Sequence, residues 1–265
     1  MSDEMNHFSM GIWLLGLAFV VSVVGSVVGL ACTRHSAFAT TSAARMRWLF
    51  MAALSIGGVA IWLMHFIAML GFAVPGSPIR YNVMWTVVSA VISVAAVFVG
   101  LLIIGTRFQW TRVLAGGLIT GLAVNVMHYT GMRALRFQGE IHYDMLYVVL
   151  SVVIAVVAGT AALWFTLVLE STLLRFVGAI IMGVAVVGMH YTGMAAVSVV
   201  HDAGAPAPEG LEVFSFLFPV FVLGLLALVV PIVAVLTAPD RTTGVRMESA
   251  PEGRPVETRD LAPSI

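Results

Sequence analysis

The sequence predicts an all-α polytopic membrane protein with seven transmembrane helices, its N-terminus outside the cell and its C-terminus inside. Of its 265 residues, 60% are hydrophobic and 10% are charged, and the mean hydropathy is +1.04. Soluble domains contain about 25% charged residues, so this composition excludes an ordinary water-soluble fold. The formal net charge is zero, which gives no field for binding nucleic acid. The single cysteine, Cys32, excludes an internal disulfide and a cysteine-rich metal cluster.

Seven apolar runs predict the seven helices and make the lipid bilayer the first expected partner. A bilayer core of about 30 Å requires about 20 apolar residues in each spanning helix. The runs are separated by breaks that contain Pro, Gly or charged residues, which are costly in hydrocarbon. The acidic start of the chain is unlike a signal peptide, so the first run is interpreted as a retained helix. The predicted spans are 8–32, 48–74, 83–105, 113–136, 145–169, 176–200 and 213–237.

The arginines predict the orientation, because cytoplasmic loops carry the excess of basic residues. Ten of the thirteen arginines lie in the first, third and fifth breaks or after the last run. We therefore expect residues 1–7 to form an outer segment and residues 8–237 to form one membrane domain. Residues 238–265 are rich in Pro, Arg and Glu and are expected to be a disordered cytoplasmic tail.

One short pattern occurs three times, on the second, fourth and sixth predicted helices. Its histidines are separated by 63 and 62 residues and are His65, His128 and His190. A glycine precedes each histidine by seven residues, close to two helical turns. It should share the histidine's face and let a neighbouring helix approach closely. These glycines are Gly58, Gly121 and Gly183.

The repeat also predicts how the copies are arranged. Each histidine precedes the outer end of its predicted helix by about eight to ten residues, or roughly 12–15 Å. Each repeating unit is a helix pair, so all copies have the same orientation, and a lone seventh helix follows them. We therefore expect a pseudo-threefold arrangement about an axis normal to the membrane. It would bring the three histidines together in the outer leaflet.

The residue types of the motif favour a metal site. A methionine follows each histidine by four residues and projects from the same helix face. Imidazole suits zinc, copper, iron and nickel, whereas a thioether favours cuprous copper. Copper is therefore the expected cofactor, with zinc as the alternative and a haem held by two histidines also open. In the competing interpretation, the histidines bond neighbouring helices and the methionines fill gaps. Three copies at one depth favour the metal site.

Polar neighbours of the histidines are candidates for cofactor binding. Tyr129 and Tyr191 follow their histidines, and they are either packing aromatics or hydroxyl donors to groups around a metal. The first copy has Phe66 at this position. Asn125 lies three residues before His128 and can orient a ligand, but the third copy has Val187 there.

The motif reads MHYTGM at 127–132 and 189–194 and MHFIAM at 64–69. Over about residues 8–237 the chain resembles the MHYT family of bacterial membrane sensor domains. The resemblance implies a multi-pass protein of the inner membrane that binds copper and senses a diatomic gas such as O2, CO or NO. Many members carry a cyclic-di-GMP enzyme or a transcription-factor domain after the last helix. This chain ends in about 28 residues of tail, so a separate cytoplasmic signalling partner is expected. The resemblance gives as metal ligands Met64, His65, Met69, Met127, His128, Met132, Met189, His190 and Met194.

Two other functions stay open on the sequence. A membrane enzyme with a three-histidine zinc or copper centre would activate water, but the carboxylates Glu140 and Asp144 lie in a predicted loop. Transport of metal ions or protons is the other alternative, although the inner halves of the helices contain few polar residues. The sequence favours a sensory and signalling role over an enzyme.

Overall fold

The computed structural model describes residues 11–202 and 204–238, and it has the expected all-α membrane architecture. Within that part of the chain, seven helices are long and apolar enough to cross a membrane. The predicted outer segment, 1–7, and nearly all of the predicted tail, 238–265, lie outside the described residues. The orientation of the helices in the membrane stays a prediction.

Six of the spans are single helices, whereas the second span contains three consecutive elements. It begins as an α-helix, continues as a π-helix labelled η1 and returns to an α-helix for the first copy of the motif. The elements are α1 (Trp13–Ala37), α2 (Ser42–Ala53), η1 (Leu54–Leu63), α3 (Met64–Met69), α4 (Val83–Ile104), α5 (Trp110–Met132), α6 (Met145–Val168), α7 (Thr172–Ala195) and α8 (Val213–Thr237).

Side-chain caps set the residues at which several helices begin. The second and sixth spans begin earlier than their hydropathy predicted. Thr41 accepts a hydrogen bond from the backbone N–H of Ala44, 3.1 Å away, and Ser171 accepts one from Leu174, also 3.1 Å away. Such caps satisfy N–H groups that the first helical turn leaves open. These spans therefore begin at residues 42 and 172, where 48 and 176 were predicted.

The helices that carry the motif end earlier than expected. They end at Met69, Met132 and Ala195, four or five residues after their histidines, or about 6–8 Å at 1.5 Å per residue. The predicted distance of 12–15 Å between each histidine and the outer end of its helix was therefore wrong. The apolar residues that follow these helices turn back or form strands, as in Val197–His201, and hydropathy does not separate a short apolar strand from the last turn of a helix.

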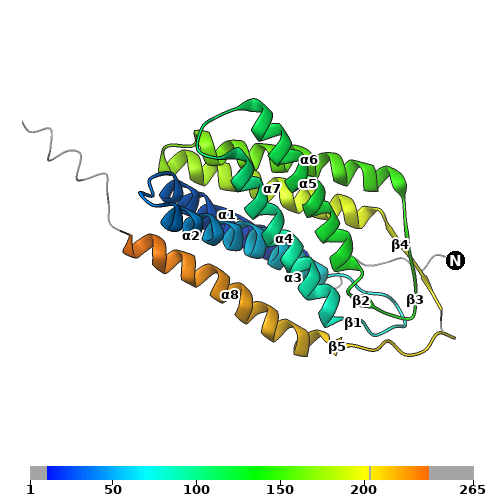
Figure 1. The fold of residues 1–265 in the computed structure, drawn as a ribbon. Helices are drawn as coiled ribbons and strands as arrows, with labels where there is room; N and C mark the ends of the chain where they lie inside the picture. The colour runs from blue at the N-terminus through cyan, green and yellow to red at the C-terminus, as the bar shows by residue number, and fades with distance from the viewer. Residues whose placement is uncertain (1–10, 203, 239–265) are drawn as a thin grey trace, which may run out of the picture.

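Short strands join the loops at this end of the bundle, which we call the strand-bearing end (Figure 1). β1 (Arg80–Tyr81) lies between β2 (Leu135–Arg136) and β5 (Leu211–Glu212), antiparallel to both. β3 (Gly139–Tyr143) pairs with β4 (Val197–His201), also antiparallel. The loops that follow all three motif helices are therefore tied to one another.

The motif helices alternate with three others, as a pseudo-threefold arrangement requires. α4 packs against η1 and α5, α6 packs against α5 and α7, and α1 packs against α7 and η1. α3 meets α5 and α7 directly. The seventh span, α8, stands outside this ring and packs along α1, α2 and η1 (Figure 1).

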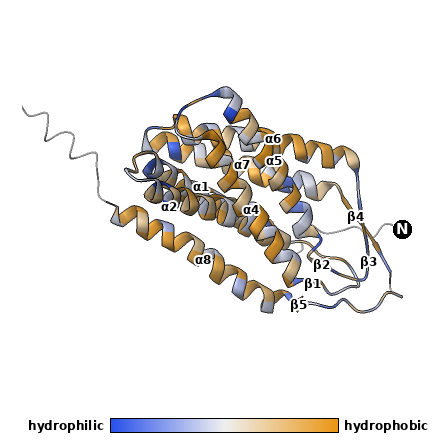
Figure 2. Cartoon of the chain, viewed as in Figure 1, coloured by the Kyte–Doolittle hydropathy of each residue, from blue (hydrophilic) through white to orange (hydrophobic). Residues whose placement is uncertain are grey.

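Apolar residues run along the outside of the bundle as well as through its core (Figure 2). The peripheral spans α6 and α8 show this best. In each of them, only 17% of an 18-residue apolar stretch is buried inside the protein. The exposed side chains of α6 include Val153 and Val157. Such a surface is compatible with hydrocarbon as its solvent.

The predicted close approach of a neighbouring helix at the repeated glycines is confirmed for the second and third copies of the motif. The prediction was wrong for the first copy. A Cβ added to Gly121 would lie 2.5 Å from the carbonyl oxygen of Ala155, and one added to Gly183 would lie 2.7 Å from Val23. At Gly58 the nearest atom is 3.7 Å away, whereas at Gly57 the carbonyl oxygen of Ser93 is 2.7 Å away. Both glycines lie in the π-helix η1, whose i→i+5 bonding changes the register of its faces.

Candidate metal centre

The three histidines meet at the centre of the bundle, as the repeat predicted. The Nδ1 atom of His65 lies 3.1 Å from that of His190 and 3.3 Å from that of His128. The ring centroids are 5.0–5.1 Å apart, with interplanar angles of 80–84°. All three side chains are at most 1% exposed. The nearly equal ring geometry extends the pseudo-threefold symmetry of the helices to the side chains.

The donor set fits a metal ion that binds imidazole. An imidazole nitrogen carries either one proton or one lone pair. A hydrogen bond joins two such nitrogens, so among three converging Nδ1 atoms one is left without a partner. One cation can accept three lone pairs at once. In tetrahedral coordination with bonds of about 2.0–2.1 Å, two nitrogens lie about 3.3 Å apart. The two Nδ1 separations above are close to this spacing.

The far sides of two of the rings, those of His65 and His128, contact the helix of the next copy. A Cβ added to Gly131 would lie 2.4 Å from Nε2 of His65, and one added to Gly193 would lie 2.5 Å from Nε2 of His128. Both Nε2 atoms are buried without a hydrogen-bond partner in the described part of the chain. Ligating histidines usually donate this N–H to an acceptor, so here tight packing is what orients the rings.

Sequence reasoning did not find the role of these glycines. Each is the third residue after the histidine of its own copy, in MHYTGM, and it packs against the histidine of the preceding copy. The equivalent residue of the first copy is Ala68. The glycine repeated in two copies was the available signal.

The six motif methionines are all buried, at most 3% exposed. They do not all lie on one side of the histidines. Met189 lines an internal cavity that extends away from the strands, whereas Met132 lines a groove at the strand-bearing end. Metal ligation by any of them stays a prediction. The six are Met64, Met69, Met127, Met132, Met189 and Met194.

Two of the three predicted polar neighbours, Asn125 and Tyr129, contact α6. The Asn125 amide donates a hydrogen bond to Oγ of Ser151, 3.0 Å away, and the Tyr129 hydroxyl lies 3.1 Å from the same oxygen. The ring of Tyr129 stands edge-on to His128, as the ring of Tyr191 does to His190. Both rings thus touch the histidine beside them in sequence, while the Tyr129 hydroxyl and Asn125 connect α5 to α6.

Intramembrane serines on the alternating helices were the second feature that the sequence analysis missed. Trp62 donates its indole N–H to Ser89 on α4, 3.0 Å away. It lies three residues before His65, the position that Asn125 has relative to His128. Two copies therefore attach the motif helix to a serine of the next helix. The third copy has Val187 there, and Ser22 on α1 is buried without a partner among the residues described.

The two candidate carboxylates, Glu140 and Asp144, do not belong to the histidine cluster. Asp144 caps α6 by accepting a hydrogen bond from the N–H of Leu146, 2.8 Å away, and Glu140 lies in β3. Over residues 11–202 and 204–238, the triad is the one cluster of three or more His, Cys, Asp or Glu side chains with donor atoms close enough to share an ion.

Burial raises the pKa of Tyr143 in β3, and neighbouring Tyr129 adds to the rise while Arg133 opposes it. The rings of Tyr143 and Tyr129 are 5.4 Å apart, edge to face. An ordinary tyrosine is already protonated at neutral pH, and the raised pKa of Tyr143 moves its ionisation further from neutrality. The strand-bearing end thus presents a neutral phenol beside the motif helix α5.

The fold and site together define a seven-helix membrane protein whose three Met-His motifs converge on one buried triad. Residues 58–117 and 121–179 match the MHYT family, described as the bacterial signalling protein N-terminal repeat. The chain belongs to this family. The two matched stretches contain the first two copies of the motif, and the third copy lies beyond them.

The chain is similar to three curated signalling proteins over part of their length. It is 37% identical over 189 residues to the bifunctional diguanylate cyclase/cyclic di-GMP phosphodiesterase MucR of Pseudomonas aeruginosa, covering 69% of this chain and 27% of that protein. An uncharacterized signaling protein of Caulobacter vibrioides is 33% identical over 167 residues, covering 63% and 20%. The signaling protein YkoW of Bacillus subtilis is 30% identical over 224 residues, covering 82% and 27%.

The chain therefore spans about a quarter of the length of these curated relatives. No solved structure matches it.

Proposed function

We propose that the protein is a sensor of the bacterial inner membrane in which the histidine triad, with methionine, holds a copper ion. The stimulus would be a diatomic gas such as O2, CO or NO, or a change in redox state. The convergence of three Nδ1 atoms from three repeated motifs, at 3.1 and 3.3 Å, carries this proposal. The relatives' printed names, which describe signalling proteins, support the sensory part.

The surroundings of the triad favour copper among metals that bind imidazole. Buried thioethers follow each histidine by four residues, and soft sulfur ligands select cuprous copper. A bound copper ion would supply a redox-active centre that can take a small ligand. The chain itself supplies three oriented rings, excludes water by burial and leaves the site without a competing carboxylate ligand within the cluster.

A stimulus at the triad would be felt as a change in helix packing. Each histidine belongs to a different span, α3, α5 or α7, so a change in the distance between two rings must move one span relative to another. We propose that a separate cytoplasmic signalling partner reads this movement. A cyclic di-GMP enzyme is the class that the name of MucR suggests.

Three alternatives fit the geometry less well. A hydrolytic zinc centre would need a general base, and the two candidates from the sequence, Glu140 and Asp144, lie in a strand and at a helix cap. Transport would need a polar path, but the residues one turn from the histidines, away from the strands, are Ile61, Val124 and Val186. Rings 5.0–5.1 Å apart leave no room for a porphyrin between them.

Metal analysis of protein purified in detergent without chelator tests the proposal. We expect about one copper per chain, because three histidines and one methionine complete a four-ligand site. The double variant His128→Ala/His190→Ala should lose it. The variant His142→Ala is the control, since this histidine lies in β3, away from the triad.

Unchanged copper in the double variant would contradict the proposal, and stoichiometric zinc would support the enzyme instead. Circular dichroism should show the same helical content in all variants. Should the double variant fail to fold, His190→Gln is the replacement, since it keeps a polar side chain of similar size. Spectra of the reduced protein with and without CO or NO would then test the gas response.

A further inference from the structure

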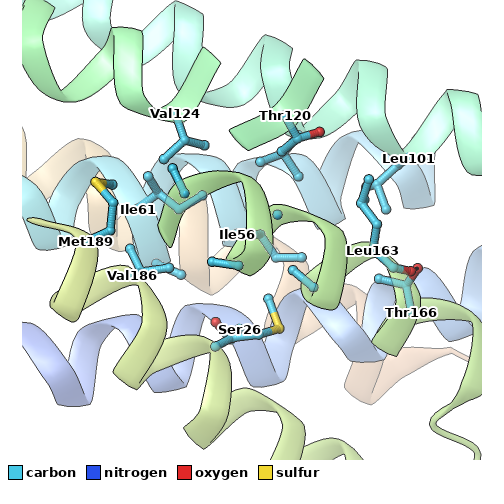
Figure 3. Close-up of a pocket in the computed structure, with 17 residues that line it drawn as sticks. Ser26, Ile56, Ile61, Leu101, Thr120, Val124, Leu163, Thr166, Val186 and Met189 are labelled. Atoms are coloured by element: carbon cyan, nitrogen blue, oxygen red, sulfur yellow. Dashed lines mark hydrogen bonds between the residues drawn. The ribbon is translucent and has the colours of Figure 1, made fainter. Parts of the chain in front are cut away.

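An internal cavity of about 50 Å³ begins one helical turn from the triad and extends away from the strand-bearing end. Its first layer contains Ile61, Val124 and Val186, each four residues before the histidine of its own helix. In Figure 3, Met189 and Val124 lie at one end of the cavity and Leu163 at the other. The cavity therefore shares its wall with the helices that position the histidines.

Small residues border this space, most of them on α6. Ala158, Gly159 and Ala162 line the cavity from α6, and Ser26 and Ala60 line it from α1 and η1. Protein interiors are close-packed, and their voids are rarely larger than a water molecule. A cavity that holds one water needs roughly 10–15 Å³ on the same kind of measure. The space beside the triad is therefore large enough for a molecule of a few atoms.

The lining is apolar apart from three hydroxyl groups. Thr166 donates its hydroxyl to the carbonyl of Leu163, and Thr120 donates to Ala96. The Ser26 hydroxyl lines the cavity, is buried and has no hydrogen-bond partner among the described residues (Figure 3). An ordered water needs two to four polar partners, and one open hydroxyl offers too few. The lining disfavours both water and ions.

We propose that this cavity is a binding site for a small, uncharged, apolar molecule, of the size of a diatomic gas or a xenon atom. Apolar cavities of proteins stay dry and bind such molecules, and the Ser26 hydroxyl offers a single weak polar contact. The ligand partitions into the bilayer, so it needs no polar entrance from water. In the sensor proposed above, the cavity would hold the gas one turn from the triad. That role rests on the proposed function, whereas binding does not.

Xenon is the probe, detected by xenon NMR of the purified protein and by anomalous scattering from crystals under xenon pressure. We expect one bound xenon bordered by Ile61, Val124 and Val186. The variant Ala162→Phe fills the space and should lower the affinity for xenon roughly tenfold or more, a change of about 1.4 kcal/mol or above. The control Val157→Phe adds the same side chain on the lipid-facing side of α6, where Val157 is exposed, and should leave binding unchanged.

Two further variants keep the test decisive. Val186→Leu adds less volume, so it should fold even if Ala162→Phe does not, and it should also weaken binding. The double variant His128→Ala/His190→Ala should keep xenon binding, which separates this site from the copper proposal. The proposal is overturned if the wild type binds no xenon, if filled variants bind it equally well, or if an ordered water on Ser26 occupies the cavity in crystals.

Discussion

The first copy of the motif differs from the other two because the seventh span covers it. In an 18-residue apolar stretch of the second span, 83% is buried inside the protein. The same share is 50% in α5 and 33% in α7. Phe66 packs on Trp62 and Phe216, with ring centroids 5.2 and 5.4 Å apart, where Tyr129 instead bonds Ser151. The first copy, MHFIAM, therefore lacks the tyrosine and threonine hydroxyls of MHYTGM, and it is the copy from which α8 excludes lipid and water.

The covered copy still contributes its histidine to the triad. Ile67, which is 1% exposed, stands where the third copy has Thr192, and the Thr192 hydroxyl donates to the carbonyl of its own helix at Gly188. A buried position favours an aliphatic side chain over a hydroxyl that must find a partner. The comparison teaches that the motif varies with its neighbours, while its central histidine is placed alike in all copies.

The largest difference between the copies should appear at the glycines where helices cross. The variant Gly121→Ala places a Cβ 2.5 Å from backbone atoms of α6, which cannot move away cheaply, so we expect it to lower the free energy of unfolding by about 3 kcal/mol. The variant Gly58→Ala meets nothing closer than 3.7 Å and should stay within about 0.5 kcal/mol of the wild type. Denaturant unfolding in micelles measures both. Equal losses would mean that the π-helix does not shift the first copy.

The glycines behind the histidines should show the next largest effect. The variants Gly131→Ala and Gly193→Ala would push a Cβ against Nε2 of a histidine, and we expect losses of about 1–3 kcal/mol in stability from overpacking. Displaced rings should also weaken metal binding by roughly tenfold or more.

The first copy supplies the contrasting variant. Ala68→Gly removes a Cβ that the native packing already accommodates, so its loss should be limited to about 1 kcal/mol from helix propensity. Gly188→Ala is the control on α7, because nothing lies within 4 Å of the added Cβ. Thermal unfolding and copper titration measure these effects. Normal metal binding by Gly131→Ala would show that the ring contact does not orient His65.

Exchanging the aromatic residues should reveal the burial of the first copy directly. The variant Phe66→Tyr inserts a hydroxyl among Trp62, Tyr81 and Phe216, and an unpaired buried hydroxyl costs about 1–3 kcal/mol. The variant Tyr129→Phe removes one hydrogen bond to Ser151 and should cost about 1 kcal/mol. Unfolding in micelles ranks the two, and the opposite order would show that Phe66 is not confined by α8.

The smallest expected effect is a gain in the third copy. The variant Val187→Asn would supply the amide that this copy lacks, and the pseudo-threefold symmetry places it toward Ser22, whose hydroxyl has no partner in the described residues. One new hydrogen bond should raise stability by about 1 kcal/mol. The same substitution in a Ser22→Ala background should give no gain, which a double-mutant cycle measures. A gain that persists without Ser22 would contradict the equivalence of the three copies.

The sequence predicted the number of spans, the period of the repeat and the meeting of the histidines, but not the ends of the motif helices. The end of α7 was placed at residue 200, whereas Val197–His201 form a strand against β3. Strand pairing involves a segment about 60 residues away, so a local apolar run cannot reveal it. The glycine prediction failed at Gly58 because this residue lies in the π-helix η1, whose faces do not follow the α-helical spacing on which the prediction was based.

Within the site, the meeting of the histidines was predictable because their spacing repeats along the chain, whereas ligation by the methionines stays a prediction. Ser89 and Ser151, which attach the motif helices to their neighbours, were not predictable, since nothing in the local sequence connects them to residues on another helix. The same holds for Gly131, which packs against a histidine of another copy.

The sequence by itself determined the membrane class, the threefold repeat and the residue types of the centre. Hydropathy and spacing are properties of the chain that survive any arrangement of the helices. Only the tertiary structure decided that the Nδ1 atoms face one another, that α8 covers the first copy and that a cavity lies beside the triad. These features depend on contacts between segments distant in sequence, where a shift of one residue along a helix turns a side chain by about 100°.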